Sequence, residues 1–400
     1  MLLTPAQSAT IDAAVHDVMR DEHISGLALA IARNGRIILL RGYGKRDDKP
    51  VSGATVFRIG SLTKQFTAAL VLQQIERGAL SFQTVAHGAT VQALLTQTSG
   101  IPNVTSMQPD QIAAALTAQP LFAPGTNWAY SNTNYLILGS LLQASSHMPF
   151  PTLLARQITQ PLHLESTRAP TDDAAAGMTS TASDLVRWLG DLGAGRVVDT
   201  TDLRAMTSSA ALLTGERTHY GYGFYVRDWY GWAIAEHPGY VDGSSADDAL
   251  VVDDGLAIAV LADATNAYLV PITKTIVSTI LPARDPSLVA DFTHPAENEN
   301  PAVTATVRAL VAELATATVD RSLLSQPLDA QLDAAELARL AQMLKPLGPL
   351  TLVEFIGRSS NAGNVMEKYR LTFGYKQYWM RLTYLPNGKI DALSIEPDRG

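Results

Sequence analysis

The segment "FRIGSLTKQFTAALVLQQIERGAL", residues 57–80, changes character after its first few residues. It opens with β-prone residues, continues over residues 62–77 with the apolar spacing of a helix, and then reaches Gly78, which fits a left-handed helix cap. Ser61 and Lys64 stand at the point of change and are three positions apart, so they share a face of the expected helix. The segment therefore predicts a strand-to-helix turn that presents a serine next to a lysine.

Serine and lysine at this spacing can act as a nucleophile and its base. A serine hydroxyl is a weak nucleophile at neutral pH and needs a nearby base to take its proton. Lysine can be that base if burial lowers its pKa, and the N–H groups at a helix N-terminus favour a developing negative charge. The alternative is an N-cap serine beside a solvated lysine. Against it, Ser61 and Lys64 form the only Ser-x-x-Lys sequence in the chain.

A second motif lies in "PGTNWAYSNTNYLILGSLL", residues 124–142, where Tyr130 and Asn132 alternate on a short loop before an expected helix. A phenol can relay a proton between a nucleophile and a leaving group, and an amide can hold a substrate carbonyl or amide group. The alternative is a buried tyrosine followed by an asparagine that caps the helix. The chain contains no other Tyr-x-Asn sequence.

A third motif is "AEHPGYVDG", residues 235–243, which is expected on a strand. Gly239 would allow a ligand to approach the backbone closely, and the N–H of Tyr240 could complete an oxyanion hole. His237 could supply a positive or hydrogen-bonding edge, or it could be a structural histidine at a strand end. We prefer His237 to His219 because two further β-like stretches follow His237, as a strand within a sheet requires.

The order of elements predicts an α/β (α+β) fold. A helix is expected over residues 8–22, a hairpin follows with its turn at Asn34-Gly35, helices fill the middle, and antiparallel strands return after residue 219 with a turn at Asp254-Gly255. Strands at both ends with helices between them predict one antiparallel sheet flanked by helices, with a helical subdomain.

The predicted domains are a first domain at residues 1–284, a linker at 285–301 rich in proline and polar residues, and a small α+β domain at 302–400. Within the last domain we expect helical stretches at about 302–319 and 329–345, followed by four strands. This domain could cover the mouth of an active site, restrict substrates or mediate a homodimer.

Composition excludes several classes of protein. The chain has 400 residues, a net charge of −8 and no cysteine, so disulfides, thiolate catalysis and cysteine-bound zinc are excluded. The acidic balance argues against a nucleic-acid partner, and the apolar runs are too short for a transmembrane segment. No His-x-x-x-His pair occurs, so we expect neither a metal nor a cofactor. The first residues do not have the pattern of a signal peptide.

Taken together and in this order, the three motifs resemble the serine β-lactamase and penicillin-binding-protein superfamily. The resemblance is greatest to its class C-like branch, which holds class C β-lactamases, D-alanyl-D-alanine carboxypeptidases, D-aminopeptidases and related esterases. "VQALLTQTSGIP", "AAGMTSTASDLVRWL" and "YGYGF" are also similar to that branch, and the resemblance covers about the first 280 residues. It implies the fold of that superfamily and a periplasmic or secreted location.

The resemblance also implies roles for individual residues. Ser61 would be the acylated nucleophile and Lys64 its base. Tyr130 would relay protons, and its contact with Lys64 would keep the proton affinity of the lysine low. Asn132 would contact the substrate amide. A further position, Gln97, stands where relatives often carry histidine.

The third motif departs from the usual Lys-Thr-Gly of the superfamily, because His237 and Gly239 would take its place. The backbone N–H groups of Ser61 and Tyr240 would form the oxyanion hole. Histidine in place of lysine would make recognition of a substrate carboxylate weaker and pH-dependent. That favours an esterase, amidase or peptidase over an efficient β-lactamase.

The resulting expectation is a serine hydrolase that acts on small esters, amides or peptides through an acyl-enzyme. One alternative is a β-lactamase or DD-carboxypeptidase that acts on β-lactams or peptidoglycan stem peptides. A second alternative is a catalytically silent binding protein of the same fold. For the C-terminal domain, the order of elements is similar to the cystatin-like or NTF2-like appendages of some members of this branch.

Overall fold

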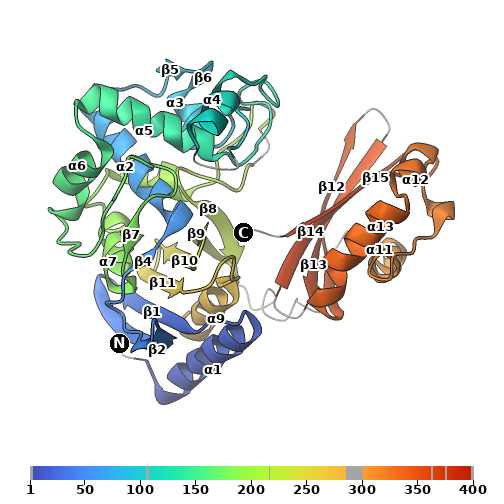
Figure 1. Ribbon diagram of the computed structural model, residues 1–400, viewed down its shortest axis with the longest axis horizontal. Helices are drawn as coiled ribbons and strands as arrows, with labels where there is room; N and C mark the ends of the chain where they lie inside the picture. Colours follow the sequence, from blue (N-terminus) through green and yellow to red (C-terminus); the bar gives the residue numbers. More distant parts are fainter. Residues whose placement is uncertain are drawn as a thin grey trace. The chain divides into compact units, whose positions relative to one another are not determined.

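The computed structural model describes residues 3–104, 108–215, 217–284, 301–361, 364–373 and 376–397. The chain divides into two compact units that meet in sequence at Arg284 and Asp285, and each unit has hydrophobic core of its own. Residues 285–300 of the predicted linker lie outside the described residues, and Pro301 is already the first residue of a helix. The predicted mixture of antiparallel sheet and flanking helices is confirmed (Figure 1).

A seven-stranded antiparallel sheet forms the centre of the first unit, in the order β3-β2-β1-β11-β10-β9-β8. Its strands are β1 Gly26–Arg33, β2 Arg36–Arg46, β3 Lys49–Pro50, β8 Tyr225–Trp229, β9 Trp232–Val241, β10 Ser244–Val251 and β11 Leu256–Ala262. Strands β1 and β11 pair directly, with Leu27 opposite Ala262. The sheet is thus built from both ends of the unit, as the order of elements predicts.

Two tight turns set the register of this sheet. Asn34 and Gly35 have φ values of 52° and 75°, so the β1–β2 turn is left-handed at both central residues, which is the geometry that favours Asn-Gly. Gly255 has a φ of 72° and closes the β10–β11 turn. The two turns touch, because the Asn34 N–H donates to the Gly255 carbonyl oxygen at 2.8 Å.

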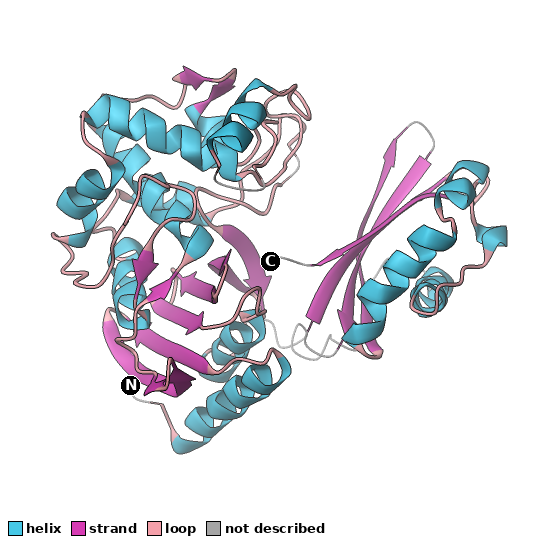
Figure 2. Ribbon diagram, viewed as in Figure 1, coloured by secondary structure: helices cyan, strands magenta, loops and turns pink. Residues whose placement is uncertain are grey.

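Helices cover both faces of the sheet (Figure 2). Along β1, Leu27, Leu29 and Ile31 pack in a core with helices α1 (Pro5–Asp21) and α9 (Val270–Ile280). The alternate residues of β1 are alanines and pack in the core that contains helices α2 (Thr63–Glu76) and α7 (Ala182–Gly193). Because both faces are covered, β1 is apolar at every position up to its last residue.

The helical part of the first unit comprises the remaining elements between β3 and β8. The helices are α2, α3 Val91–Leu95, α4 Pro109–Thr117, α5 Asn132–Ser146, α6 Phe150–Leu154, a π-helical turn at Ala155–Thr159, α7 and α8 Thr200–Thr207. The short strands are β4 Phe57–Arg58, β5 Val85–Ala86, β6 Ala89–Thr90 and β7 Thr179–Ser180. Helix α2 is buried at nearly every position, so it lies inside the unit.

The second unit packs helices against a four-stranded antiparallel sheet of order β12-β13-β14-β15. Its elements are α11 Pro301–Leu314, α12 Gln326–Gln331, α13 Ala334–Leu344, 3-10 turns at Arg321–Leu323 and Lys345–Leu347, β12 Leu350–Asn361, β13 Asn364–Phe373, β14 Lys376–Tyr384 and β15 Ile390–Pro397. The four predicted strands are confirmed.

The helical stretch predicted at about 329–345 is confirmed, but it is divided between two helices, α12 and α13. The Asp333 side chain accepts hydrogen bonds from the N–H groups of Ala335 and Glu336, both at 2.9 Å. This N-cap starts a new helix, α13, after Leu332, the C-cap residue of α12.

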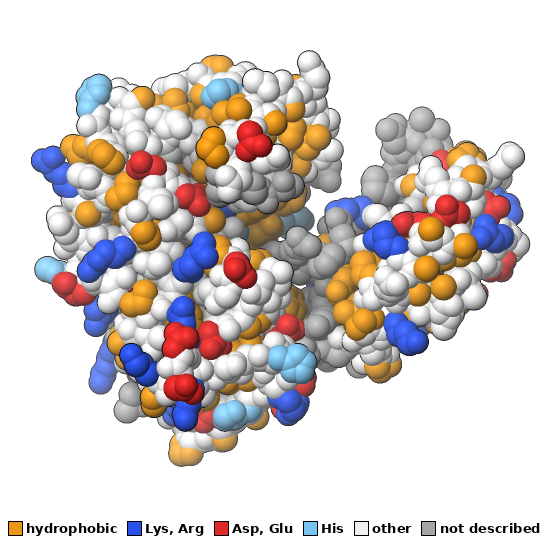
Figure 3. Space-filling model, viewed as in Figure 1, with side chains coloured by type: hydrophobic (Ala, Val, Ile, Leu, Met, Phe, Trp, Pro, Cys, Tyr) orange, Lys and Arg blue, Asp and Glu red, His pale blue; other side chains and the backbone are white. Residues whose placement is uncertain are grey.

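Charges of both signs are interspersed over the coloured surface of Figure 3. Among the residues that the structure describes, none of the helices is both long enough and apolar enough to cross a membrane.

Candidate active site

Ser61 lies in a 3-10 turn, Gly60–Leu62, that joins the short strand β4 to helix α2. Strand β4 pairs with β7, which fixes the chain just before the turn. Gly60 has a φ of +53°, a conformation that favours glycine, and the Thr63 hydroxyl donates to the Gly60 carbonyl oxygen at 2.7 Å. The turn leaves Ser61 half-buried while the following residues are fully buried.

The side chain of Lys64 is fully buried and its amine contacts three oxygen atoms. The Nζ atom lies 3.1 Å from Ser61 Oγ, 2.7 Å from Asn132 Oδ1 and 2.9 Å from the carbonyl oxygen of Ala175. Burial lowers the pKa of Lys64 to about 7, against the negative charge of Asp173, which raises it. Near neutral pH a large fraction of the amine is therefore unprotonated and can accept the serine proton.

The Tyr130 hydroxyl donates to Ser61 Oγ at 2.8 Å. Burial raises the pKa of Tyr130 well above its usual range, so its phenol keeps its proton at neutral pH. Lys64 does contact Tyr130, but through the face of the ring, 4.9 Å from its centroid. A ring face attracts a cation, so this contact does not lower the pKa of the lysine as the resemblance implied; burial does.

Asn132 is the first residue of helix α5 and is held by neighbouring amide groups. Its N–H donates to Asn103 Oδ1 at 2.8 Å, while its own Oδ1 accepts from Lys64. The adjacent loop is fixed by the buried Gln97, whose Oε1 accepts from the Ser131 N–H at 3.1 Å and from Asn134 Nδ2 at 2.6 Å. Gln97 thus positions the loop that carries the tyrosine and the asparagine, a role that the sequence did not reveal.

His237 lies on β9, as predicted, with both ring nitrogens engaged. Its Nδ1 is 2.7 Å from the carbonyl oxygen of Pro238, and its Nε2 is 3.2 Å from the Tyr220 hydroxyl. A carbonyl oxygen can only accept, so Nδ1 carries the proton and Nε2 accepts from the tyrosine. Burial, together with the charge of Lys64, lowers the pKa of His237 to about 3. The expected pH-dependent positive charge at His237 is therefore wrong, because the imidazole is neutral.

Glycines at positions 60 and 239 allow two backbone segments to touch. A Cβ atom on Gly239 would lie 2.1 Å from the carbonyl oxygen of Ile59, and one on Gly60 would lie 2.9 Å from the Tyr240 nitrogen. The close approach predicted at Gly239 is thus made by the chain itself, at the turn that carries Ser61. It brings the Tyr240 nitrogen beside that turn.

Aromatic rings surround the histidine and the tyrosine of this site. The Tyr225 ring stacks on Tyr130 with centroids 6.2 Å apart and an interplanar angle of 7°, and its centroid lies 5.1 Å from that of His237. Tyr220 meets Tyr225 edge-on at 5.0 Å, and Trp128 lies 6.0 Å from Tyr220. Tyr220 and Tyr225 were not among the predicted site residues, although both lie in the aromatic run "YGYGFY".

Buried carboxyl groups lie on both faces of the sheet next to this site. Asp248 Oδ1 accepts from Gln65 Nε2 at 2.7 Å, which ties β10 to the nucleophile helix. On the other face, Asp247 accepts from Thr273, and Glu236 pairs with Arg227 at 3.2 Å. Within the described residues, no three histidine, aspartate or glutamate side chains gather so as to hold a metal ion.

Comparisons with known proteins agree with this architecture. The profile of the Beta-lactamase family matches residues 11–269. "Protein flp" of Staphylococcus aureus (strain COL) is 31% identical over 193 residues, a match that covers 41% of this chain and 39% of that protein. The chain therefore spans about two fifths of the length of that curated relative.

Among solved structures, D-amino acid amidase from Ochrobactrum anthropi SV3, complexed with L-phenylalanine, superposes with a TM-score of 0.61 at 18% identity, covering 68% of this chain and 98% of that one. The β-lactamase/D-alanine carboxypeptidase from Pseudomonas syringae superposes with a TM-score of 0.61 at 21% identity, covering 69% and 100%. These similarities show a shared fold.

Proposed function

This chain belongs to the β-lactamase family, and we propose that it is a serine hydrolase that acts on small esters, amides or peptides. The observation that carries this proposal is the contact set of Ser61 Oγ, which lies 3.1 Å from Lys64 Nζ and 2.8 Å from the Tyr130 hydroxyl. A hydroxyl between a buried amine and a phenol is the arrangement that nucleophilic catalysis needs.

Acylation begins when the neutral amine of Lys64 accepts the proton of Ser61. The serine oxygen attacks the substrate carbonyl carbon and forms a tetrahedral oxyanion. The N–H groups of Ser61 and Tyr240 stabilise this oxyanion. Tyr130 donates its proton to the leaving alcohol or amine as the bond to the carbonyl carbon breaks, and the proton on Lys64 restores the phenol.

Deacylation repeats these steps with water as the nucleophile. The neutral amine of Lys64 removes a proton from water as the water oxygen attacks the acyl carbon. The Ser61 oxygen then leaves and takes a proton back. Asn132 keeps the Lys64 amine in place during both steps and orients the substrate amide through the remaining donor atoms of its side chain.

The preference for esters, amides or peptides rests on the third motif. The neutral imidazole of His237 stands where the superfamily usually has lysine, so this position supplies no cation for a substrate carboxylate. The shared fold with a D-amino acid amidase supports an amide substrate. The similar superposition on a β-lactamase/D-alanine carboxypeptidase keeps β-lactams and stem peptides as the second candidate.

The two units have different functions. The unit up to Arg284 is the hydrolase domain, and the unit after the linker is an accessory domain that restricts substrates or mediates a homodimer.

Labelling with a fluorophosphonate and with a fluorescent penicillin, followed by peptide mass spectrometry, tests the proposal. We expect an adduct on Ser61 that is absent in Ser61→Ala. A panel of p-nitrophenyl esters, D-amino acid amides, D-alanyl peptides and nitrocefin then separates the candidate activities. The absence of any adduct and of any turnover would instead favour a catalytically silent binding protein.

A further inference from the structure

We propose that Asp173 is a positioning residue for the lysine of this site: its side chain shapes the turn that offers the Ala175 carbonyl to Lys64, and its negative charge acts on the same amine. This inference rests on the proposed function, in which Lys64 is the base. Asp173 lies outside the three sequence motifs.

The first observation is the geometry of the turn. Asp173 Oδ1 accepts from the N–H groups of Ala175 at 2.9 Å and Ala176 at 3.0 Å. The Asp173 carbonyl oxygen accepts from the Gly177 N–H at 3.1 Å. The side chain and main chain of one residue thus close the turn, and the Ala175 carbonyl oxygen points out of it to Lys64 Nζ at 2.9 Å.

The second observation is that this turn is docked on helix α2. The Thr67 hydroxyl donates to the Ala174 carbonyl oxygen at 2.7 Å, and the Met178 N–H donates to the Thr63 hydroxyl oxygen at 3.2 Å. Both partners lie on the helix that carries Lys64. Ala174 and Ala175 are buried in this contact, so the distance between the turn and the amine is fixed by packing as well as by hydrogen bonds.

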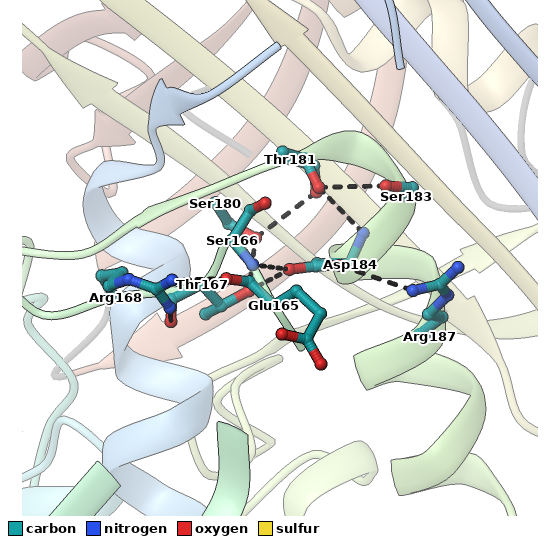
Figure 4. Close-up of polar contacts among 9 residues, drawn as sticks. All are labelled: Glu165, Ser166, Thr167, Arg168, Ser180, Thr181, Ser183, Asp184 and Arg187. Atoms are coloured by element: carbon teal, nitrogen blue, oxygen red, sulfur yellow. Dashed lines mark hydrogen bonds and ion pairs between the residues drawn. The ribbon is translucent and has the colours of Figure 1, made fainter. Parts of the chain in front are cut away.

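The third observation is the rigid stem of the loop. Arg168 and Thr179 exchange two backbone hydrogen bonds of 2.9 Å, which close the segment between them. Figure 4 shows Asp184, at the start of α7, in contact with both sides of this stem; on one side its N–H donates to the Thr181 hydroxyl oxygen at 3.1 Å. Its carboxylate accepts from the Ser166 N–H at 2.8 Å and from the Thr167 hydroxyl at 3.1 Å. These hydrogen bonds fix the two ends of the segment that contains the turn at Asp173.

The groups in contact with the Lys64 amine carry no negative charge, so the charge of Asp173 is important for the pKa of that amine. Ser61, Asn132 and Ala175 offer neutral oxygens, and the rings of Tyr130 and Tyr135 lie 4.9 and 5.6 Å from Nζ.

Burial of the amine lowers its pKa and Asp173 raises it, while the neighbouring His237 is neutral. Removing the charge of Asp173 while keeping the shape of the turn should therefore make Lys64 a weaker base that is unprotonated at lower pH.

Two substitutions separate the shape of the turn from its charge. Asp173→Asn keeps an oxygen that can accept both N–H groups but removes the charge. Asp173→Ala removes both. Asp172→Asn is the matched control, because Asp172 lies in the same loop but accepts from the Phe150 N–H at 3.1 Å, on helix α6. Lys64 is followed directly by NMR of ¹³Cε-labelled lysine, assigned with Lys64→Met, and indirectly by the pH dependence of kcat/KM.

In Asp173→Asn we expect the titration of Lys64 and the acidic limb of kcat/KM to move together to lower pH by about 0.5 to 1 unit, with kcat at its plateau reduced only a few-fold. In Asp173→Ala we expect kcat to fall by about 10- to 100-fold with a smaller change in KM, because the amine loses a fixed partner. In Asp172→Asn neither quantity should change.

Two results would overturn the inference: an unchanged Lys64 titration in Asp173→Asn, or an equal shift in Asp172→Asn. The NMR titration does not depend on turnover. If it shifts as expected while no Ser61 adduct forms, the role of Asp173 stands and the proposed hydrolase activity is what fails.

Discussion

A Cβ atom on Gly239 would lie 2.1 Å from the carbonyl oxygen of Ile59, so β9 and the chain entering the Ser61 turn are in direct backbone contact. Contacts this close do not tolerate a methyl group without a shift of the backbone. The position of Tyr240 beside Ser61 therefore depends on the absence of a side chain at residue 239.

Gly239→Ala should consequently displace β9 from the turn, lower the stability of the fold by about 1–3 kcal/mol and reduce acylation of Ser61 by about 100-fold. Thermal unfolding and the rate of fluorophosphonate labelling measure the two effects. Gly190→Ala is the control, because a Cβ on Gly190 in helix α7 meets its nearest neighbour at an ordinary 3.5 Å. Normal labelling by a folded Gly239→Ala protein would contradict the arrangement described.

The pH dependence of turnover should be set by Lys64. Burial lowers the pKa of Lys64 to about 7. The unprotonated amine is the active form, so kcat/KM should rise with pH through this value and fall about tenfold for each pH unit below it.

His237, with a pKa lowered to about 3, should contribute no step between pH 5 and 9. Histidine ¹⁵N NMR should show its ring fixed as the Nδ1–H tautomer over that range. An acidic limb that disappears in His237→Asn would show that the wrong group has been assigned.

Adding a negative charge at position 132 should raise the pKa of Lys64, whereas removing the negative charge of Asp173 should lower it. Asn132 Oδ1 lies 2.7 Å from Lys64 Nζ, so Asn132→Asp places a carboxylate against the amine. We expect the pKa of Lys64 to rise by about 1–3 units and the acidic limb of kcat/KM to move up with it. Asn127→Asp, at an exposed position of the same loop, should leave the limb in place. An unmoved limb in Asn132→Asp would mean that Lys64 is not the titrating group.

The buried carboxyl of Asp247 should make the fold less stable as pH rises. Burial and the neighbouring Glu236 raise the pKa of Asp247 well above its usual range. The folded protein therefore retains a proton that the unfolded chain releases above about pH 4, so the stabilising contribution of Asp247 is full below that pH and is lost as pH rises toward the folded pKa.

Asp247→Asn has no such proton to lose, and its melting temperature should fall less between pH 5 and 8. We expect a gain of about 1–3 kcal/mol at pH 8 relative to the parent chain. Calorimetry across this range, with exposed Asp242→Asn as control, measures the difference. Parallel curves for the parent chain and Asp247→Asn would refute the assignment.

The parts of the fold that sequence could predict are those with a local signature. Local sterics or burial impose a sequence pattern on three such parts: the Asn34-Gly35 turn, the helix that starts at Thr63 and the strands that follow His219. The meeting of Ser61, Lys64, Tyr130 and Asn132 followed from a resemblance of three motifs, and the structure brings these four residues into contact.

The parts that sequence could not predict depend on backbone groups and on burial. The hydrogen-bond acceptor on Ala175 is a main-chain carbonyl oxygen, which any residue could supply. The type of residue at this position therefore does not indicate the contact with Lys64. The neutral state of His237 follows from its complete enclosure in the folded unit, since a histidine has an ordinary pKa near 6.5 in an open chain. The break between α12 and α13 depends on Asp333, whose capping role competes with a continuous helical pattern.

The direct pairing of β1 with β11 has a consequence for how the protein is made. Ser61 and Lys64 are synthesised well before β11. Strand β1, which contains Leu27, has both of its neighbouring strands only after Ala262 and the rest of β11 have been made. Until then, the nascent chain displays an open strand edge, a feature that invites aggregation and that chaperones shield. A chain that lacks β11 therefore leaves one edge of β1 without its partner strand.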